Sequence, residues 1–233
     1  MPEVKKPTTW SYSSLTKFEK CPAQWKYAKI DRLPDPSGPA AARGSRIHAQ
    51  LERALKTEDA GVPEVSLVDY VAALRLRRPE VEVMWHFDRD WQFLGPDLYE
   101  PGANRALAKA SWLLVKMDAY VAPTPGRKPR PAHVVDWKTG KIYPDHEQQG
   151  ELYAVSSASR DGGTAVDVDM VYVDQAHVEK WRLEIGAALE EMQGEWAERA
   201  EKMLTATEYR AKPGQGCHWC SFSGRKKGPC RAG

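Results

Sequence analysis

Four cysteines, placed at both ends of the chain, constrain the fold more than any other feature of the sequence. Cys217 and Cys220 are separated by two residues, Cys230 lies close to the C-terminus, and Cys21 lies almost two hundred residues upstream. The Cys-x-x-Cys spacing brings two ligands to one centre from a tight turn, and four thiolates hold either a tetrahedral zinc ion or an iron–sulfur cluster. The pattern predicts one metal centre that joins the two ends of the chain, with a pair of disulfides as the alternative.

The length of the chain and its N-terminal composition favour a metal over disulfides. With 233 residues and only four cysteines, the chain can bury a core without covalent links. Lys5 and Lys6 are followed by Pro7 and polar residues instead of the apolar stretch of a signal peptide. No segment approaches the roughly 20 apolar residues of a membrane span. We therefore expect a soluble cytoplasmic protein with no membrane partner and with reduced cysteines.

Charge is unevenly distributed, although the formal net charge is only +2. Two basic segments stand out, with these residues: Arg127, Lys128, Arg130, Lys138 and Lys141 in the first, and Arg225, Lys226, Lys227 and Arg231 in the second. The first segment contains a single acid, Asp136, and the second contains none. Such segregation is typical of a surface that binds a polyanion, although ordinary solvated faces remain an alternative.

Hydrophobic periodicity predicts helices first, then strands, then a final helix. Ser13 or Ser14 is expected to cap a short first helix, and Pro22 suits the first turn of a second, which places Cys21 at a helix junction. Further helices are expected over 40–56, 67–77 and 145–159 and around the stripe Leu189, Met192, Trp196 and Met203, with strands over 81–91, 111–121, 132–138, 166–173 and 178–183. This order predicts an α/β fold with a mixed central β-sheet flanked by helices.

The strand over 132–138 carries the clearest chemical signal. Alternate side chains of a strand point the same way, so Asp136 and Lys138 share one face. Asp118 lies on the preceding expected strand and can reach the same point. Two carboxylates that converge with a lysine suit phosphodiester hydrolysis by Mg²⁺ or Mn²⁺, although an isolated Asp-x-Lys pattern is also typical of a surface ion pair.

Three segments together resemble one family of nucleases. Residues 136–140, preceded by Asp118 and followed by Gln149 and Tyr153, resemble the core of the RecB-type PD-(D/E)XK nucleases. Residues 43–48 are similar to the Gly-x-x-x-His helix that precedes this core. Residues 11–22 resemble the N-terminal segment of the subgroup with an iron–sulfur cluster, which includes the AddB nuclease domain and CRISPR-associated exonucleases, some of them phage-encoded. The resemblance implies a restriction-endonuclease-like fold and spans the chain from residue 11 to residue 230.

The resemblance also implies roles for individual residues. His48, Asp118 and Asp136 would bind Mg²⁺ or Mn²⁺, Lys138 would be the catalytic lysine, and Gln149 and Tyr153 would complete the catalytic set at the rim of the active site. Cys21, Cys217, Cys220 and Cys230 would hold a [4Fe-4S] cluster, with zinc left open. His218 and Trp219 are expected to pack around that centre. Other acids could replace or supplement Asp118: Glu52, Glu82, Asp88, Asp90 and Asp97.

The expected function is that of a metal-dependent DNA exonuclease that acts on single strands or strand ends in recombination, repair or CRISPR or phage DNA processing. A single nuclease domain over 1–233 would have its core at 40–185 and a cluster region formed by 1–30 and 205–233. The partner is DNA, bound by Arg127, Lys128, Arg130, Lys141, Arg225, Lys226 and Lys227. A structure-specific endonuclease and a non-cleaving iron–sulfur protein that binds nucleic acid remain alternatives.

Overall fold

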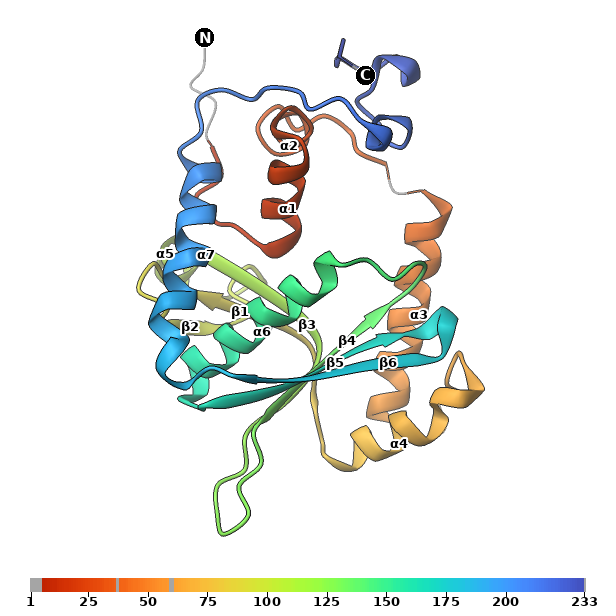
Figure 1. Cartoon of the computed structure of the whole chain (residues 1–233), viewed down its shortest axis with the longest axis vertical. Coiled ribbons are helices and arrows are strands. Elements are labelled where there is room, and N and C mark those ends of the chain that lie inside the picture. Colours follow the sequence, from red (N-terminus) through yellow and green to blue (C-terminus); the bar gives the residue numbers. More distant parts are fainter. Residues whose placement is uncertain (1–5, 37, 59–60, 233) are drawn as a thin grey trace. The chain divides into compact units, whose positions relative to one another are not determined.

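The computed structural model describes residues 6–36, 38–58 and 61–232. It divides into two compact units, which we call the terminal unit (Met1–Ser37 and Glu195–Gly233) and the sheet unit (Gly38–Gly194). The helices are α1 (Tyr12–Lys20), α2 (Pro22–Lys29), α3 (Pro39–Lys56), α4 (Val68–Leu76), α5 (Arg105–Ala110), α6 (Asp145–Asp161) and α7 (Leu189–Leu204) (Figure 1). The strands are β1 (Glu80–Phe87), β2 (Phe93–Pro96), β3 (Leu113–Val121), β4 (Ala132–Lys138), β5 (Ala165–Tyr172) and β6 (His177–Glu184).

A six-stranded mixed sheet forms the centre of the sheet unit, with the strand order β2-β1-β3-β4-β5-β6. Only β4 and β5 pair in parallel, and the other neighbours are antiparallel. Helix α6 makes the crossover between the two parallel strands, as a parallel pair requires. The structure confirms the predicted α/β class and is consistent with a restriction-endonuclease-like fold.

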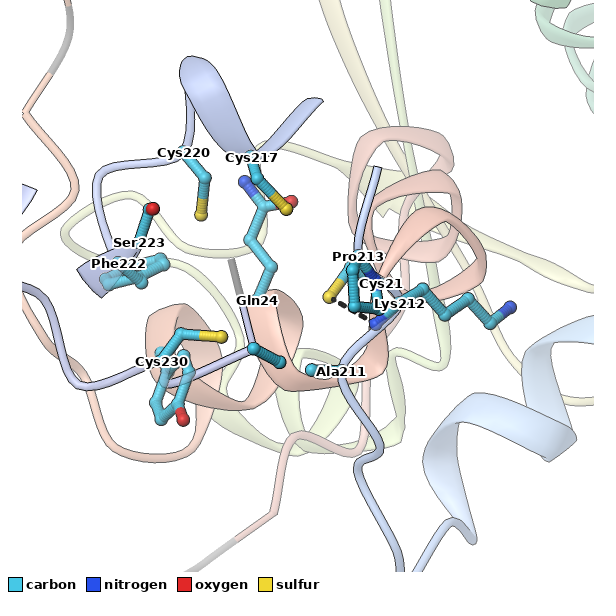
Figure 2. A pocket seen from close by; sticks show the side chains of 12 residues that line it. Cys21, Gln24, Ala211, Lys212, Pro213, Cys217, Cys220, Phe222, Ser223 and Cys230 are labelled. Atoms are coloured by element: carbon cyan, nitrogen blue, oxygen red, sulfur yellow. Dashed lines mark hydrogen bonds between the residues drawn. The ribbon is translucent and has the colours of Figure 1, made fainter. Parts of the chain in front are cut away.

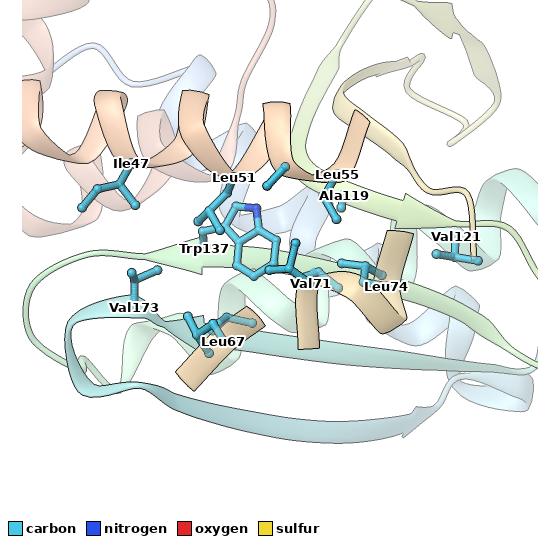
Figure 3. Packing of buried hydrophobic residues seen from close by; sticks show 13 residues of the cluster. Ile47, Leu51, Leu55, Leu67, Val71, Leu74, Ala119, Val121, Trp137 and Val173 are labelled. Carbon is cyan, nitrogen blue, oxygen red and sulfur yellow. The ribbon is translucent and has the colours of Figure 1, made fainter. Parts of the chain in front are cut away.

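Helices α3 and α4 cover one face of this sheet with a continuous apolar core (Figure 3). Leu51 and Ala54 of α3 are fully buried against Val135 and Trp137 of β4. The buried positions of α3 recur at helical spacing, and the two β4 residues of this core, Val135 and Trp137, alternate with Asp136 and Lys138 along the strand. The alternation fixes the register of β4, because a slip of one residue would bury the two charged side chains in this core.

Aromatic contacts hold the terminal unit together. Trp25 of α2 is fully buried, and its indole Nε1–H donates to Ser14 Oγ at 2.9 Å. The Trp25 ring also stacks on Tyr209, with 5.9 Å between centroids, and Trp10 stacks on Trp196 at 6.1 Å. These pairs connect the N-terminal part of the terminal unit to its C-terminal part.

Most predicted elements agree with the structure, and two differences have clear causes. The strand expected over 81–91 ends at Phe87, because the Asp88 carboxylate accepts the backbone N–H groups of Asp90 and Gln92 and closes a turn into β2. The prediction that Ser13 or Ser14 caps α1 is wrong. Ser11 is the N-cap residue, and Ser13 and Ser14 both lie within the helix, where Ser14 is buried. In the described chain, no helix has the length and apolar character needed to cross a membrane.

Candidate active site and cysteine pocket

Two acids lie where β3 and β4 separate, at a place we call the fork. The two strands pair at Val121 with His133, Tyr120 with Val134 and Ala119 with Val135, and there the ladder ends. The next residue on each strand is an acid, Asp118 on β3 and Asp136 on β4. Beyond the ladder, a side chain replaces the backbone as hydrogen-bond acceptor: Asp118 Oδ2 accepts the backbone N–H of Trp137 at 2.8 Å. Both side chains are buried.

Glu82 of β1 adds a third carboxylate to the row. Strand β1 pairs with β3 at Val81 with Ala119 and at Val83 with Met117, which places Glu82 directly opposite Asp118. Like charges at opposite positions destabilise a sheet. The backbone of Glu82 also has a φ of +52°, a left-handed conformation that costs a side-chain-bearing residue about 1–3 kcal/mol. Such a costly arrangement of acids is typical of a functional site.

His48 reaches the fork from α3. The close approach of this helix to the end of β4 depends on Gly44, because a Cβ there would lie 3.0 Å from Thr139 Oγ1. One turn further on, His48 Nδ1 lies 2.9 Å from Asp118 Oδ1. Ligand atoms of His48, Glu82 and Asp118 all lie within 4.8 Å of one another, and His48, Glu82 and Glu52 line a hollow beside them. Imidazole nitrogen with carboxylate oxygens suits a divalent metal ion.

The acids of the fork shift the pKa values of Asp118 and His48. Burial raises the pKa of Asp118, and the neighbouring charge of Asp136 raises it further. Burial alone would lower the pKa of His48, but the hydrogen bond to Asp118 and the charges of Asp118, Asp136 and Glu82 outweigh it, so this pKa is above its ordinary value. A bound cation would relieve the same repulsion.

Four polar side chains form a closed ring on the other side of the fork. The Lys138 ammonium lies 2.5 Å from Asp136 Oδ2 and donates to Gln149 Oε1 at 2.7 Å. Gln149 Nε2 donates to Tyr153 Oη at 2.5 Å, and the Tyr153 hydroxyl donates to Asp136 Oδ1 at 2.6 Å. Gln149 and Tyr153 are one turn apart on α6. Gln149 therefore reaches Lys138 while Tyr153 reaches Asp136.

The ring corrects one expectation about the site. Tyr153 does not lie at the rim: it is 1 % exposed, because its ring belongs to the buried face of α6. Burial raises the pKa of its hydroxyl, which therefore stays a hydrogen-bond donor and positions Asp136. Asp136 Oδ2 is buried against the Lys138 ammonium, so within the described residues an ion pair offsets its charge.

The remaining candidate residues lie apart from these two groups. Asp88 closes the turn after β1, and neither Asp90 nor Asp97 belongs to the group of possible metal ligands around His48. Sequence reasoning left Glu82 open; only the pairing of β1 with β3 singles it out. The predicted DNA-binding residues are all exposed: Arg127, Lys128 and Arg130 in the β3–β4 hairpin, Lys141 after β4, and Arg225, Lys226 and Lys227 near the C-terminus.

The four cysteines line one hollow of the terminal unit, which we call the cysteine pocket (Figure 2). All four are free thiols, so the disulfide alternative is wrong. Cys21 lies at the junction of α1 and α2, as predicted, and its Sγ accepts the backbone N–H of Lys212 at 3.5 Å. Among the described residues, no three of the sulfur atoms lie within 4.8 Å of one another.

A tight return of the chain brings Cys230 to this pocket. The N–H of Cys230 donates to the carbonyl of Phe222 at 3.0 Å, and Gly228 passes directly against the Phe222 backbone. A side chain at Gly228 would clash there, so the return requires glycine. Phe222 is 2 % exposed, whereas Trp219 is 85 % exposed. The expectation that Trp219 packs around the metal centre is therefore wrong.

Zinc and a cubane cluster require different spacings of the four thiolates in the cysteine pocket. A single zinc ion with Zn–S bonds of about 2.3 Å would bring its four sulfur atoms to within about 4 Å of one another. A cubane cluster spaces its thiolates more widely, because each one binds a different iron. The four free thiols line one hollow, but among the described residues no three of them form a close group, so as arranged here they do not form a closed site for either cofactor.

A family model and two solved structures are similar to this chain. Residues 9–225 match the family model of the PD-(D/E)XK nuclease superfamily. The fold is similar to the crystal structure of SSO0001, with a TM-score of 0.52 and 16 % identity over 99 % of this chain and 89 % of that one. An alkaline exonuclease, LHK-Exo from Laribacter hongkongensis, has a TM-score of 0.28 and 12 % identity over 85 % of this chain and 90 % of the other. No curated protein matches the sequence significantly.

Proposed function

Because the chain belongs to the PD-(D/E)XK nuclease superfamily, we propose that it is a metal-dependent DNA exonuclease of the RecB type that acts on single strands or strand ends. The observation that carries this proposal is the row of carboxylates from Glu82 through Asp118 to Asp136, with Lys138 beside it. A protein that only binds nucleic acid needs basic and aromatic residues, but it has no use for converging buried acids.

His48, Glu82, Asp118 and Asp136 would hold Mg²⁺ or Mn²⁺, the ions that carboxylates and imidazole suit. Bound there, the ion would polarise a phosphate and lower the pKa of a water molecule. Lys138 would stabilise the negative charge that develops on the phosphate. Gln149 and Tyr153 are positioning residues in this proposal, since the first holds the ammonium and the second holds Oδ1 of Asp136.

Cys21, Cys217, Cys220 and Cys230 would hold a [4Fe-4S] cluster in the terminal unit. Support comes from the free thiols around one hollow and from the Lys212 N–H that donates to Cys21 Sγ at 3.5 Å. The cluster would link α1 and α2 to the C-terminal segment. Protein purified without oxygen should then contain about four iron and four sulfide per chain; stoichiometric zinc without iron would contradict the assignment.

The basic hairpin would bind DNA away from the fork. Thr124 and Arg130 exchange two backbone hydrogen bonds of 3.0 Å, an isolated bridge that holds together the two arms of the connection projecting from the sheet between β3 and β4 (Figure 1). Arg130 precedes Asp136 by six residues, or about 20 Å of extended chain. On duplex DNA this length corresponds to about six base pairs at 3.4 Å each. The hairpin would therefore contact phosphates remote from the one that is cleaved.

The test of the proposed function compares three DNA substrates with protein purified without oxygen. End-labelled linear single strands, end-labelled linear duplexes and circular single strands are incubated with Mn²⁺ or with EDTA, and a Lys138→Ala variant is the matched control. We expect Mn²⁺-dependent loss of the linear substrates and survival of the circle. Cleavage of the circle would indicate an endonuclease, and no cleavage of any substrate would leave a binding protein.

A further inference from the structure

Trp219 is exposed on a loop that is otherwise well anchored. This loop, residues 214–230, which we call the cysteine loop, begins with a 3₁₀ turn over Gln215–His218 and contains a second one over Gly224–Lys226. Its apolar anchor is Phe222, which is 2 % exposed and contacts the ring of Tyr27 with 5.5 Å between centroids. Trp219 is 85 % exposed and makes no ring contact with any residue that the structure describes. The loop thus buries one aromatic residue and presents the other.

Two cationic side chains contact the backbone of Trp219 and its neighbour His218. The ammonium of Lys226 donates to the carbonyl oxygen of Trp219 at 3.2 Å. A guanidinium nitrogen of Arg225 lies 3.4 and 3.3 Å from the two ring nitrogens of the neighbouring His218. These contacts fix the backbone of Trp219 and leave its ring uncovered. After Glu208 the sequence contains six Lys and Arg residues and no acid, so the surroundings attract an anion.

We propose that Trp219 is a stacking platform for an unpaired base of single-stranded DNA, with Arg225 and Lys226 binding the phosphates on either side of that base. Single-stranded nucleic acid is recognised by this combination of a cationic surface and an exposed aromatic ring. The inference rests on the proposed function only in taking DNA as the ligand. It makes the cysteine pocket the support of a base-binding loop, since Cys217 and Cys220 flank His218 and Trp219.

Charge favours DNA over a protein as the partner. An exposed tryptophan is also typical of protein interfaces, where Arg is enriched but Lys is depleted. Around Trp219 the neighbours are His218, Arg225 and Lys226, all of them exposed. An acidic protein surface would satisfy the cations, but it offers a π-face only where it carries an aromatic side chain, whereas every nucleotide pairs a flat base with a phosphate.

The test measures binding with cleavage disabled by Asp136→Ala in all proteins compared. Two oligonucleotides of equal length and charge are used, oligo(dT) and an oligomer in which the central bases are replaced by abasic sites. Trp219→Ala should weaken the binding of oligo(dT) about five- to one-hundred-fold, as expected for one stacked base, and should leave binding of the abasic oligomer unchanged. Trp219→Phe should restore most of the affinity. Leu76→Ala removes an equally exposed apolar side chain from α4 and should change nothing.

The salt dependence of binding separates stacking from charge. Trp219→Ala should keep the wild-type slope of log K against log salt, whereas Lys226→Ala should reduce its magnitude by about 0.7, the value for one phosphate on a single strand. Equal affinity of Trp219→Ala and wild type for oligo(dT) would overturn the proposal and leave a protein as the partner of the indole. Equal losses on both oligonucleotides, or loss of iron from Trp219→Ala, would also overturn it. These outcomes do not depend on cleavage, so they are distinguishable from a failure of the proposed nuclease activity.

Discussion

The fork and the cysteine pocket contain two sets of potential metal ligands that are held in very different ways. At the fork, Asp118 is bound by His48 and by a backbone N–H, and Asp136 is bound by Tyr153 and Lys138. In the cysteine pocket, the only hydrogen bond to a sulfur atom within the described chain is the one from Lys212. The protein itself therefore positions the first set, whereas few contacts of the described residues position the second.

This difference separates two uses of a metal. When the ligands of a site are already positioned, ion binding costs little free energy for ordering their side chains. Such a site can exchange its ion during catalysis. A site whose ligands come from distant parts of the sequence converts metal-binding free energy into folding free energy. We expect loss of metal to affect activity at the fork and folding at the cysteine pocket.

The largest expected effect is the loss of a cysteine ligand. Cys21→Ala should remove iron and destabilise the terminal unit by several kcal/mol, since structural metal sites contribute about 10–16 kcal/mol to folding. Thermal unfolding, iron content and limited proteolysis near the C-terminus measure the change. Gln24→Ala, which alters the same pocket without removing a thiol, is the control and should retain iron. A Cys21→Ala protein with full iron content and an unchanged Tm would show that Cys21 is not a ligand.

At the fork, the corresponding change should affect chemistry and leave folding intact. Asp136→Ala removes a carboxylate from beside Lys138, so Mn²⁺-dependent cleavage should fall by at least about 10³-fold, while Tm and iron content stay close to wild type. Single-turnover degradation of end-labelled DNA measures the rate. Asp90→Ala, at an exposed acid outside the fork, should cleave normally. Loss of iron from Asp136→Ala would break the contrast between the two sites.

A smaller effect is expected from Glu82, whose role only the strand pairing reveals. Glu82→Gln should weaken Mn²⁺ binding at least about 10-fold, because a carboxylate ligand becomes a neutral amide. Its Tm should change little, because relief of the Glu82–Asp118 repulsion offsets the loss of the 2.8 Å ion pair between Glu82 and Lys116. Titration calorimetry with Mn²⁺ measures the affinity, and Glu190→Gln on α7 is the control. Wild-type Mn²⁺ affinity in Glu82→Gln would remove this residue from the metal site.

The smallest effect concerns a buried network of the sheet unit that contains no candidate ligand. Burial raises the pKa of Asp169, but hydrogen bonds from His133 and Tyr70 and the charge of Lys180 outweigh it, so the folded-state pKa lies below the ordinary 3.8. A lowered pKa stabilises the fold above about pH 4, and that contribution disappears as the pH falls through the folded-state pKa.

Asp169→Asn tests this pH dependence. The variant should be less stable than wild type by about 1–3 kcal/mol at pH 7, the cost of disrupting a buried charged hydrogen-bond network. The difference should shrink below pH 4, because Asp169 of the wild type then becomes protonated. Denaturant unfolding between pH 3 and pH 7 measures it. A difference that is constant over this range would mean that the carboxylate charge of Asp169 does not contribute to stability.

The sequence predicted those parts of the site that depend on local periodicity. The strand bearing Asp136 and Lys138 was predicted with its observed bounds, and α6 was predicted from its first residue, because alternation and helical spacing are local signals. The proximity of Glu82 to Asp118 depends on pairing between β1 and β3, which single-sequence periodicity does not specify. The exposure of Trp219 and the burial of Tyr153 depend on tertiary packing, which decides which of several aromatic residues enters a core.

Lys138→Ala gives the most direct test of the central claim, that the fork is a preorganised site for metal-dependent cleavage of DNA. The acids remain in this variant, so Mn²⁺ affinity and DNA binding should stay near wild-type values, while the single-turnover cleavage rate should fall about 10²- to 10³-fold. Lys109→Ala, at an exposed lysine of α5, controls for the loss of one positive charge and should cleave normally. Cleavage by Lys138→Ala at the wild-type rate would contradict the account and leave the Asp136–Lys138 contact as a structural ion pair.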